Sequence, residues 1–431
     1  MIADDVLRDV KEEVELIKEG TWLPPYRRQD YARIANFLQT KQAIAVTGLR
    51  QVGKTTILKQ IAHDKQDDFQ FWYLSVDSLV DKTPKALNEI IYYFIKNSER
   101  KPLIIIDEIQ KISGWAETIK KFYDMRPVKF LLSGSASLKI TKGKESLAGR
   151  MIDVFLPPLR FKEYLKLSGI DTDGKDLSLM QEKLSEAFVD YCFRGGLPEL
   201  CTEENPERIR TMVENNTINK VIFEDIPEVF NVRNRALLFK LFKHGCETTG
   251  SLFDYSSIGK VYGVSKDTVR DYLFYLEQSF LLYEVPRHAK GVSKRERNLK
   301  KLFVANPSIA IQILRYNRNI LDTELSGRFV ETAVYNYLQT CFDSIRFWRD
   351  EQKREVDFVV GENLLIEVKY QSRILPEDTK SIKAALNDIP GARAIVVTKN
   401  TSETRDGIAF VPAWRFMLME KKEIMKTVGL G

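Results

Sequence analysis

The sequence predicts an α/β protein in which a parallel sheet with a phosphate-binding loop comes first and a second α/β unit follows. Three observations carry this prediction. Short apolar runs alternate with helical segments between residues 43 and 132, a glycine-rich loop follows the first run, and strand-like and helical patterns return over residues 322–431. Strands that alternate with helices are typical of a parallel sheet covered by helices on both faces.

The expected elements follow in a simple order. Residues 1–40 carry apolar positions at helical spacing, interrupted at Pro24 and Pro25. The segment 161–223 is also expected to be helical apart from an interruption at 194–198, and short helices and a strand are expected over 232–285. The strands expected in the first sheet are 43–46, 71–76, 103–106 and 128–132.

The composition narrows the classes of function. The chain has 431 residues with a net charge of +6, four cysteines without zinc-site spacing and three scattered histidines. Histidine metal cages and serine triads are therefore disfavoured, and we expect hydrolytic chemistry to depend on carboxylates, lysines, arginines and Mg²⁺. No apolar run is long enough to span a membrane and the N-terminus is too charged for a signal peptide, so we expect a cytoplasmic protein with no membrane partner.

Residues 48–55, GLRQVGKT, form a phosphate-binding motif between a predicted strand and a predicted helix. The glycines let backbone N–H groups face a phosphate chain, and the helix adds its positive end. Lys54 would reach the β- and γ-phosphates and Thr55 would bind Mg²⁺; the alternative is a strand-to-helix turn that matches by chance. The residues expected to hold the nucleotide are Gly48, Arg50, Gln51, Val52, Gly53, Lys54, Thr55 and Thr56.

Two acids follow the apolar strand expected at 103–106. Asp107 is expected to hold the Mg²⁺ shell beside the phosphate loop, and Glu108 to orient and polarise the attacking water. The alternative is a solvated acidic turn. Ser133 ends the next strand, where its hydroxyl could contact the γ-phosphate or the water, although an ordinary strand-end turn explains it equally well.

Arg150 is a candidate for an arginine that contacts the γ-phosphate, supplied in this interpretation to a neighbouring subunit. Arg194 is a weaker candidate. Phosphoryl transfer benefits from an additional cation, but surface arginines are common, and an ordinary surface role is the alternative. A homo-oligomer, either a ring or a dimer, is expected because an arginine acting in trans needs a neighbour.

Six segments together resemble a known family: GLRQVGKTT, IIIDEIQKISGW, LLSGSAS, SLAGR, LRFKEY and GGLPE. In this order they look like the prokaryotic AAA-type ATPases that carry a C-terminal domain of unknown function. The resemblance implies ATP binding and hydrolysis by an AAA+ module, and it departs from the family at Asn306, where an aspartate is frequent. It divides the chain into the ATPase core with N-terminal helices (1–158), a helical lid (159–231), a winged helix (232–305) and a nuclease-like domain (306–431).

Residues 256–273 are expected to form a helix, a glycine-containing turn and a second helix capped by Ser265. A basic segment, 286–301, follows the next expected strand, and together they would suit phosphate contacts along a DNA duplex. The alternatives are a module that packs against protein and a solvated linker. The residues expected to contact DNA are Lys266, Thr268, Arg270, Lys294, Arg295 and Arg297, and the segment also holds Arg287, Lys290, Lys300 and Lys301.

A second group of acids lies near the C-terminus. Glu367 and Lys369 are two residues apart on an expected strand and point to one face, where Asp357 on the paired strand can reach them. Two carboxylates that share Mg²⁺ beside a lysine suit phosphodiester hydrolysis. The arrangement resembles the PD-(D/E)xK nucleases, with Asp357, Glu367 and Lys369 at the core motif, Glu331 at the position of the helix-borne acid, and Asp357 and Glu367 as implied metal ligands. The alternative is a retained fold that only grips nucleic acid.

Together these expectations describe an AAA+ protein that acts on DNA with ATP and Mg²⁺ as cofactors. ATP turnover would drive DNA binding or remodelling, and the C-terminal site would cut the DNA. Repair, processing of branched or Holliday-type junctions and defence against foreign DNA all stay open. The alternative function is a nucleotide-dependent switch that binds DNA or protein without cutting, and a third is an ATPase directed only at protein.

Overall fold

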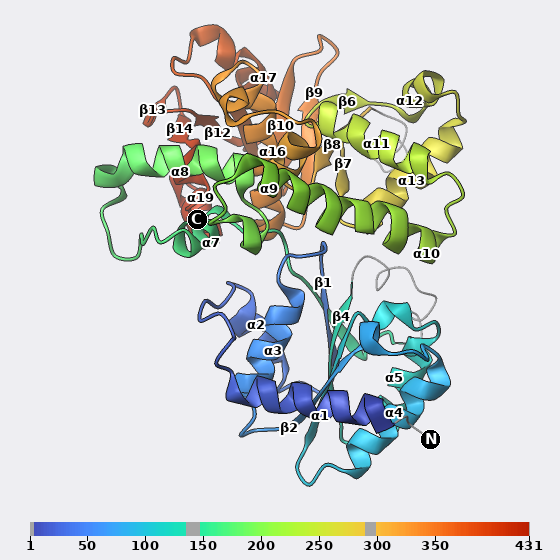
Figure 1. Ribbon diagram of the computed structural model, residues 1–431. Helices are drawn as coiled ribbons and strands as arrows, with labels where there is room; N and C mark the ends of the chain where they lie inside the picture. Colours follow the sequence, from blue (N-terminus) through green and yellow to red (C-terminus); the bar gives the residue numbers. More distant parts are fainter. Residues whose placement is uncertain (1–3, 135–146, 289–298, 431) are drawn as a thin grey trace. The chain divides into compact units, whose positions relative to one another are not determined.

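The computed structural model describes residues 4–134, 147–288 and 299–430. The chain divides into two compact units, residues 1–157 and 158–431, each with its own internal packing (Figure 1). The segments expected as lid, winged helix and nuclease-like domain all fall within the second unit. Their boundaries stay predictions.

The first unit is a five-stranded parallel sheet in the order β2-β3-β4-β1-β5, with helices on both faces (Figure 1). Helix α1 packs on α3, and α4 packs on α5. The four predicted strands are confirmed; the edge strand β5, only partly buried, was not predicted. The strands are β1 (Ala43–Thr47), β2 (Gln70–Ser75), β3 (Pro102–Asp107), β4 (Lys129–Gly134) and β5 (Met151–Phe155). The helices are α1 (Asp4–Glu19), α2 (Tyr31–Phe37), α3 (Lys54–Asp64), α4 (Pro84–Lys96) and α5 (Trp115–Met125).

Burial explains why the central strands read as continuous apolar runs. All residues of β1, β3 and β4 are buried, because helices cover both faces of a parallel sheet. Because the strands are parallel, the carboxyl ends of β1 and β3 lie at the same edge of the sheet, and the side chains that follow these two strands can meet there.

The second unit begins with helices, as the pattern over 161–223 predicts. A π-helical stretch continues directly from α9 into α10. These elements are α7 (Phe161–Leu167), α8 (Gln181–Arg194), α9 (Pro206–Thr211), two π-helical segments (Met212–Asn219 and Val221–Asp225) and α10 (Ile226–Phe230).

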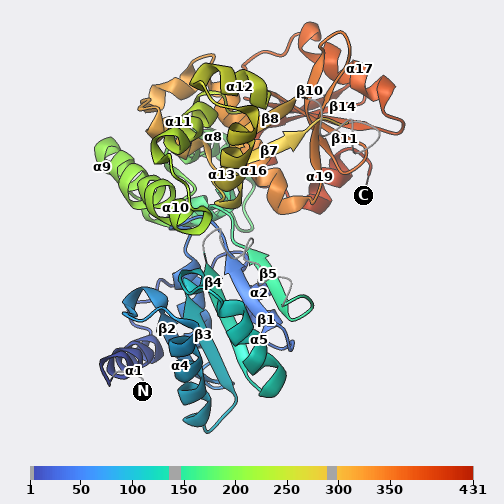
Figure 2. The same ribbon diagram turned by 90° about the vertical axis from the view of Figure 1, so that its right-hand side faces the viewer.

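A small three-stranded antiparallel sheet of order β6-β8-β7 follows, with three helices beside it (Figure 2). Gly263 follows the end of α12 with a φ of 69°, which favours glycine, and Ser265 caps α13 by accepting a hydrogen bond from the Thr268 N–H, as predicted. The elements are α11 (Arg235–Glu247), β6 (Leu252–Phe253), α12 (Tyr255–Tyr262), α13 (Lys266–Gln278), β7 (Leu282–Pro286) and β8 (Lys300–Val304).

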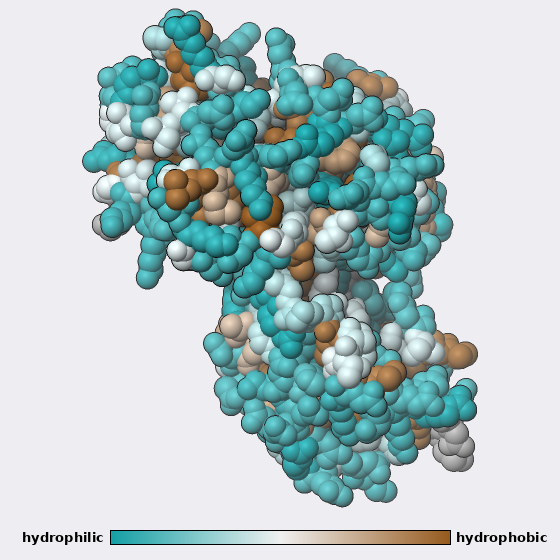
Figure 3. All heavy atoms as spheres, turned by 60° about the vertical axis from the view of Figure 1, so that its left-hand side comes forward, coloured by the Kyte–Doolittle hydropathy of each residue, from teal (hydrophilic) through white to brown (hydrophobic). Residues whose placement is uncertain are grey.

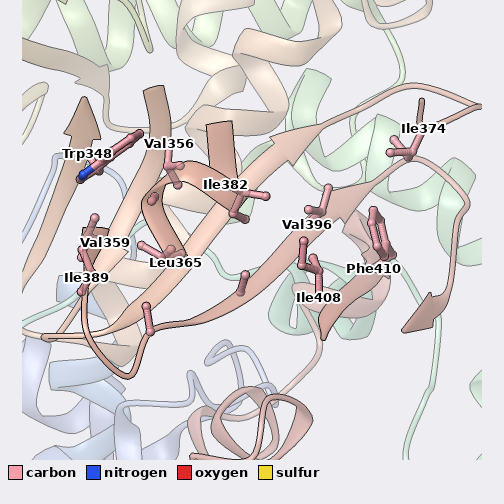
Figure 4. Packing of buried hydrophobic residues seen from close by; sticks show 13 residues of the cluster. Trp348, Val356, Val359, Leu365, Ile374, Ile382, Ile389, Val396, Ile408 and Phe410 are labelled. Carbon is pink, nitrogen blue, oxygen red and sulfur yellow. The ribbon is translucent and has the colours of Figure 1, made fainter. Parts of the chain in front are cut away.

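The rest of the second unit is built on a six-stranded mixed sheet of order β13-β14-β12-β11-β10-β9. Side chains from β9 to β12, from β14 and from α17 pack into one apolar cluster that includes Trp348, Val356 and Phe410 (Figure 4). The strands are β9 (Ile345–Arg349), β10 (Glu355–Val360), β11 (Leu364–Lys369), β12 (Arg393–Thr398), β13 (Glu403–Arg405) and β14 (Ile408–Pro412). The helices are α15 (Pro307–Ile313), α16 (Ser326–Cys341), α17 (Lys380–Asp388), α18 (Ala413–Phe416) and α19 (Lys421–Thr427).

Short 3₁₀ helices complete the described secondary structure. They span Val76–Ser78, Ile109–Lys111, Leu177–Met180, Pro198–Leu200, Arg318–Asp322 and Pro376–Thr379. Within the described ranges, the helices all fall short of the length and apolar character needed to cross a lipid bilayer. The face drawn in Figure 3 is mainly hydrophilic, with hydrophobic side chains scattered over it.

Candidate functional sites

The loop between β1 and α3 has the backbone that a phosphate cradle requires. Gly48 has a φ of 155°, and a Cβ atom there would lie 2.3 Å from the carbonyl oxygen of Leu156, so a larger residue does not fit. Gln51 and Gly53 both have positive φ, and Gly53 forms the N-cap of α3. The loop therefore turns sharply into the helix, whose free N–H groups favour an anion.

Lys54 lies over this loop. It is the first residue of α3, only 4% exposed, and its ammonium donates hydrogen bonds of 3.0 Å to the carbonyl oxygens of Gly48 and Leu49. The side chain is thus held back over the backbone of the loop, and its contact with phosphates stays a prediction.

Thr55 and Asp107 meet although 52 residues separate them. The Thr55 hydroxyl donates a hydrogen bond of 2.6 Å to Asp107 Oδ2, which also accepts one of 2.9 Å from the Tyr73 hydroxyl. Burial, followed by the charge of Asp107, raises the pKa of Tyr73, so this hydroxyl stays protonated and remains a donor. A hydroxyl beside a carboxylate is a set of oxygen donors that fits Mg²⁺.

Ser133 and Glu108 complete this edge of the sheet. The Ser133 hydroxyl donates to Asp107 Oδ1 and accepts a 3.1 Å hydrogen bond from the backbone N–H of Glu108. Its described partners are therefore these two acids, and a contact with phosphate or water stays a prediction. Glu108 has a φ of 57°, and its carboxylate accepts a hydrogen bond from the Gln110 side chain.

The two arginine candidates each have partners within their own unit. Arg150 pairs with Asp124 at 2.9 Å, with both side chains at least a third exposed. Arg194, in the second unit, donates to the carbonyl oxygen of Glu203 at 2.6 Å and lies 3.6 Å from Asp190. A role of Arg150 in a neighbouring subunit stays a prediction.

Sequence reasoning missed Arg28. This arginine is 6% exposed and donates hydrogen bonds of 2.5 Å to the Val52 carbonyl oxygen and 2.9 Å to that of Pro157. It therefore ties the phosphate loop to the segment after β5. The printed sequence shows only a pair of adjacent arginines, which is typical of a surface, and Arg27 indeed pairs with Asp64 on the part-exposed surface.

The second group of predicted residues also comes together. The Asp357 carboxylate on β10 accepts a 2.9 Å hydrogen bond from the Val368 N–H, and the Asp357 N–H donates one of 3.3 Å to Glu367 Oε2. Lys369 pairs with Glu367 Oε1 at 2.7 Å. Strand pairing thus places Asp357 beside Glu367 and Lys369, as expected.

A lysine that was expected to face DNA lies among these acids instead. The Lys301 ammonium is 2.8 Å from Asp357, 2.9 Å from Glu331 and 2.9 Å from Glu355, and its side chain is 2% exposed. We call Lys301 and the acids Glu331, Glu355, Asp357 and Glu367 the acid cluster. Assigning Lys301 to a DNA-contacting segment was therefore wrong, because β8 carries it into the interior.

Donors of the chain itself engage the oxygens of Asp357 and Glu367, so the role of these two acids as metal ligands stays a prediction. The oxygens of Asp357 accept from Lys301 and the Val368 N–H, and those of Glu367 from Lys369 and the Asp357 N–H. All four candidate ligand oxygens thus already have donors from the chain.

The pKa directions agree with this internal pairing. Burial alone would lower the pKa of Lys301, but Asp357, Glu331 and Glu355 raise it well above its ordinary value. Burial, and then the charge of Asp357, raise the pKa of Glu367 to about 8. Lys301 is therefore charged, whereas burial and repulsion by Asp357 make Glu367 hold its proton more tightly than an exposed glutamate does.

The other residues expected to contact DNA differ in their exposure and in their partners. Lys266 is exposed, Thr268 shares a 2.9 Å hydrogen bond with Ser265, and Arg270 pairs with Asp267 at 3.1 Å and Asp271 at 3.5 Å. The remaining residues expected to contact DNA, Lys294, Arg295 and Arg297, and also Lys290, lie outside the described residues.

Two further members of the basic segment have internal partners. Lys300 pairs with Glu284 at 2.6 Å, and Arg287 donates to the carbonyl oxygen of Arg349. Arg287, Lys300 and Lys301 therefore all have partners within the second unit. The expected role of the basic segment as a row of phosphate contacts is corrected for these three residues.

Comparison with known families identifies the first unit. Residues 40–165 match the family model described as an AAA domain. This part of the chain is an AAA domain. Behind the AAA domain, residues 185–319 and 326–416 match two models described as domains of unknown function (DUF8612 and DUF4143).

Uncharacterized relatives match most of the chain. The chain is 23% identical over 410 residues to the uncharacterized protein MJ1637 of Methanocaldococcus jannaschii, covering 88% of this chain and 85% of that protein. It is 25% identical over 399 residues to the uncharacterized protein Rv2008c of Mycobacterium tuberculosis, covering 90% and 83%. Among solved structures, Cdc6p from Pyrobaculum aerophilum aligns over 70% of this chain and 98% of its own, with 9% identity and a TM-score of 0.30.

Proposed function

We propose that the protein is a nucleotide-dependent switch: the first unit binds and hydrolyses ATP, and the second unit binds DNA without cutting it. The observation that carries the first part is the meeting of Thr55 and Asp107 at 2.6 Å beside Lys54 on the phosphate loop. Lys54 and Thr55 begin α3 and Asp107 ends β3, and only the folded sheet brings them together.

Each residue of this site has a role in the proposal. Thr55 and Asp107 would hold Mg²⁺, which when bound would offset the charge of the phosphate oxygens. Lys54 would exchange its two carbonyl partners for the phosphates. Glu108, placed just beyond β3 by its left-handed backbone, would orient the attacking water and accept its proton. Ser133 would position Asp107 and Glu108.

Association of several copies belongs to the same proposal. Arg150 lies in the turn before β5, where it pairs with a half-exposed aspartate rather than with the phosphate loop of its own chain. A neighbouring copy could receive this guanidinium if the pair with Asp124 opened. We therefore propose a homo-oligomer in which Arg150 acts in trans.

For the second unit, the acid cluster supports DNA binding over DNA cleavage. Cleavage by a PD-(D/E)xK site needs carboxylates free to hold a metal ion, and here Lys301 and backbone donors use them. We therefore favour DNA binding without cleavage. The nuclease stays the second candidate because Asp357, Glu367 and Lys369 are placed together.

The support for DNA is the arrangement of α12 and α13. A tight turn joins the two helices, Ser265 caps the second, and Lys266 is exposed in its first turn. This is the order of a helix-turn-helix, in which the start of the second helix faces the DNA. Arg270 would reach phosphate by leaving Asp267 and Asp271, whose exposed pairs with it are weak.

We expect the double variant Lys266→Ala, Arg270→Ala to bind duplex DNA about 10-fold more weakly at 0.1 M salt. The magnitude of the slope of log affinity against log salt concentration should fall by roughly 1–2, because about one counterion fewer is released for each phosphate contact that is lost. Fluorescence anisotropy with a labelled duplex at several salt concentrations measures both quantities.

The matched control is Lys383→Ala, an exposed lysine on α17 that pairs with Asp406. It should bind DNA as the wild type does. If the wild type shows no salt-dependent affinity for duplex, single-stranded or branched DNA, the DNA proposal fails, and a protein partner becomes the better explanation.

A further inference from the structure

Strand β8 delivers two adjacent lysines to different surroundings. Lys301 pairs in register with Leu252 of β6 and Val285 of β7, so its backbone is fixed in the middle of the small sheet. Successive side chains on a strand point to opposite faces. Lys300 therefore meets Glu284 and Tyr255, whereas Lys301 enters the acid cluster.

The acid cluster needs a positive charge, and Lys301 is placed to supply it. Three carboxylates lie within 2.9 Å of one buried ammonium. Carboxylates without a cation are costly to bury, and a divalent metal ion is the other common way to compensate them. The contacts of 2.8–2.9 Å suit an ammonium, since Mg²⁺ requires oxygens at roughly 2.0–2.1 Å.

We propose that Lys301 is the resident cation of the acid cluster, so that the wild-type chain binds no divalent metal ion there and removal of the Lys301 side chain creates a site that does. The proposal concerns the ion that this cluster accepts, and it is independent of whether the first unit hydrolyses ATP or the second binds DNA. In this proposal, Lys301 determines whether the acid cluster accepts a divalent metal ion.

The experiment is a titration of the full-length, nucleotide-free chain with Mn²⁺, with free Mn²⁺ followed by electron paramagnetic resonance. We compare wild type, Lys301→Ala and the control Lys300→Ala, which removes the neighbouring lysine from the same strand. We expect Lys301→Ala to bind about one more Mn²⁺ per chain than the other two. Mn²⁺ held by the phosphate loop contributes equally to all three and cancels in the comparison.

Thermal unfolding gives a second readout on the same proteins. Mn²⁺ at 100 times its dissociation constant should raise the unfolding temperature of Lys301→Ala by roughly 5 °C or more, and that of wild type and Lys300→Ala by less. A Lys301→Ala chain that folds but binds no additional Mn²⁺ and gains no stability from it overturns the proposal.

A separate comparison keeps the proposal testable if Lys301→Ala does not fold. The double variant Glu331→Gln, Asp357→Asn retains Lys301 and loses two of the acids. Wild type and this variant should bind the same amount of Mn²⁺, because the proposal gives neither a metal ion in the cluster. A wild-type chain that binds one ion more than the double variant shows that the acids hold metal despite Lys301, and the proposal fails.

Discussion

Lys54→Ala is expected to weaken ATP binding and to lower ATP turnover by about 100-fold or more. Lys54 is 4% exposed, and its ammonium lies over the backbone of the phosphate loop. A preorganised charge in such a site contributes about 2.7–4 kcal/mol to stabilising developing negative charge. Titration with a fluorescent ATP analogue and a phosphate-release assay measure the two losses separately.

The matched control is Lys65→Ala, which removes a part-exposed lysine at the far end of α3, paired with Asp68. Its binding and turnover should equal those of wild type, because its pair is on the surface and contributes little. Unchanged ATP binding and hydrolysis in Lys54→Ala would contradict the assignment of the phosphate loop.

Lys301→Met is expected to destabilise the second unit by about 3–5 kcal/mol, which is the cost of leaving buried charges without their partner. The lysine side chain is 2% exposed and holds Glu331, Glu355 and Asp357 together. Urea unfolding followed by circular dichroism, in the presence of a chelator, gives the change in the transition of this unit.

Two companion variants separate the loss of charge from the loss of packing. Lys300→Met removes the adjacent, more exposed lysine and should cost about 1 kcal/mol or less. Adding Glu331→Gln and Asp357→Asn to Lys301→Met should recover most of the lost stability, because a neutral cluster no longer needs the cation. If Lys301→Met is as stable as wild type, the acid cluster does not depend on this lysine.

The nucleotide site could be predicted because its determinants are local. The loop at 48–55 and the acids after β3 lie at strand ends, and a parallel sheet brings such ends to one edge. The hydrogen bond between Thr55 and Asp107 follows from that topology. Arg28 could not be predicted, because its second partner, the Pro157 carbonyl, is 129 residues away and leaves no pattern near the arginine.

The acid cluster could likewise be predicted only in part. Asp357, Glu367 and Lys369 were predictable from a hairpin whose strands pair in one register. Lys301 was not, because it stands in a basic segment that resembles a solvent-exposed linker, and its partners lie 30 to 56 residues further along the chain. Side chains alternate between the two faces of β8, so the register of this strand determines which of the two lysines is buried. The sequence does not mark where the strand begins, and the buried lysine could therefore not be identified from it.

The central claim is that the first unit hydrolyses ATP and that the second unit binds DNA without cutting it. One reaction tests this claim most directly. Wild-type protein is incubated with ATP, Mg²⁺ and a panel of end-labelled linear, single-stranded and branched DNA, and phosphate release and DNA length are measured in the same sample. The account predicts steady phosphate release, lost in Lys54→Ala, with every DNA at its original length. DNA shortened by the wild type, or no phosphate released, would contradict it.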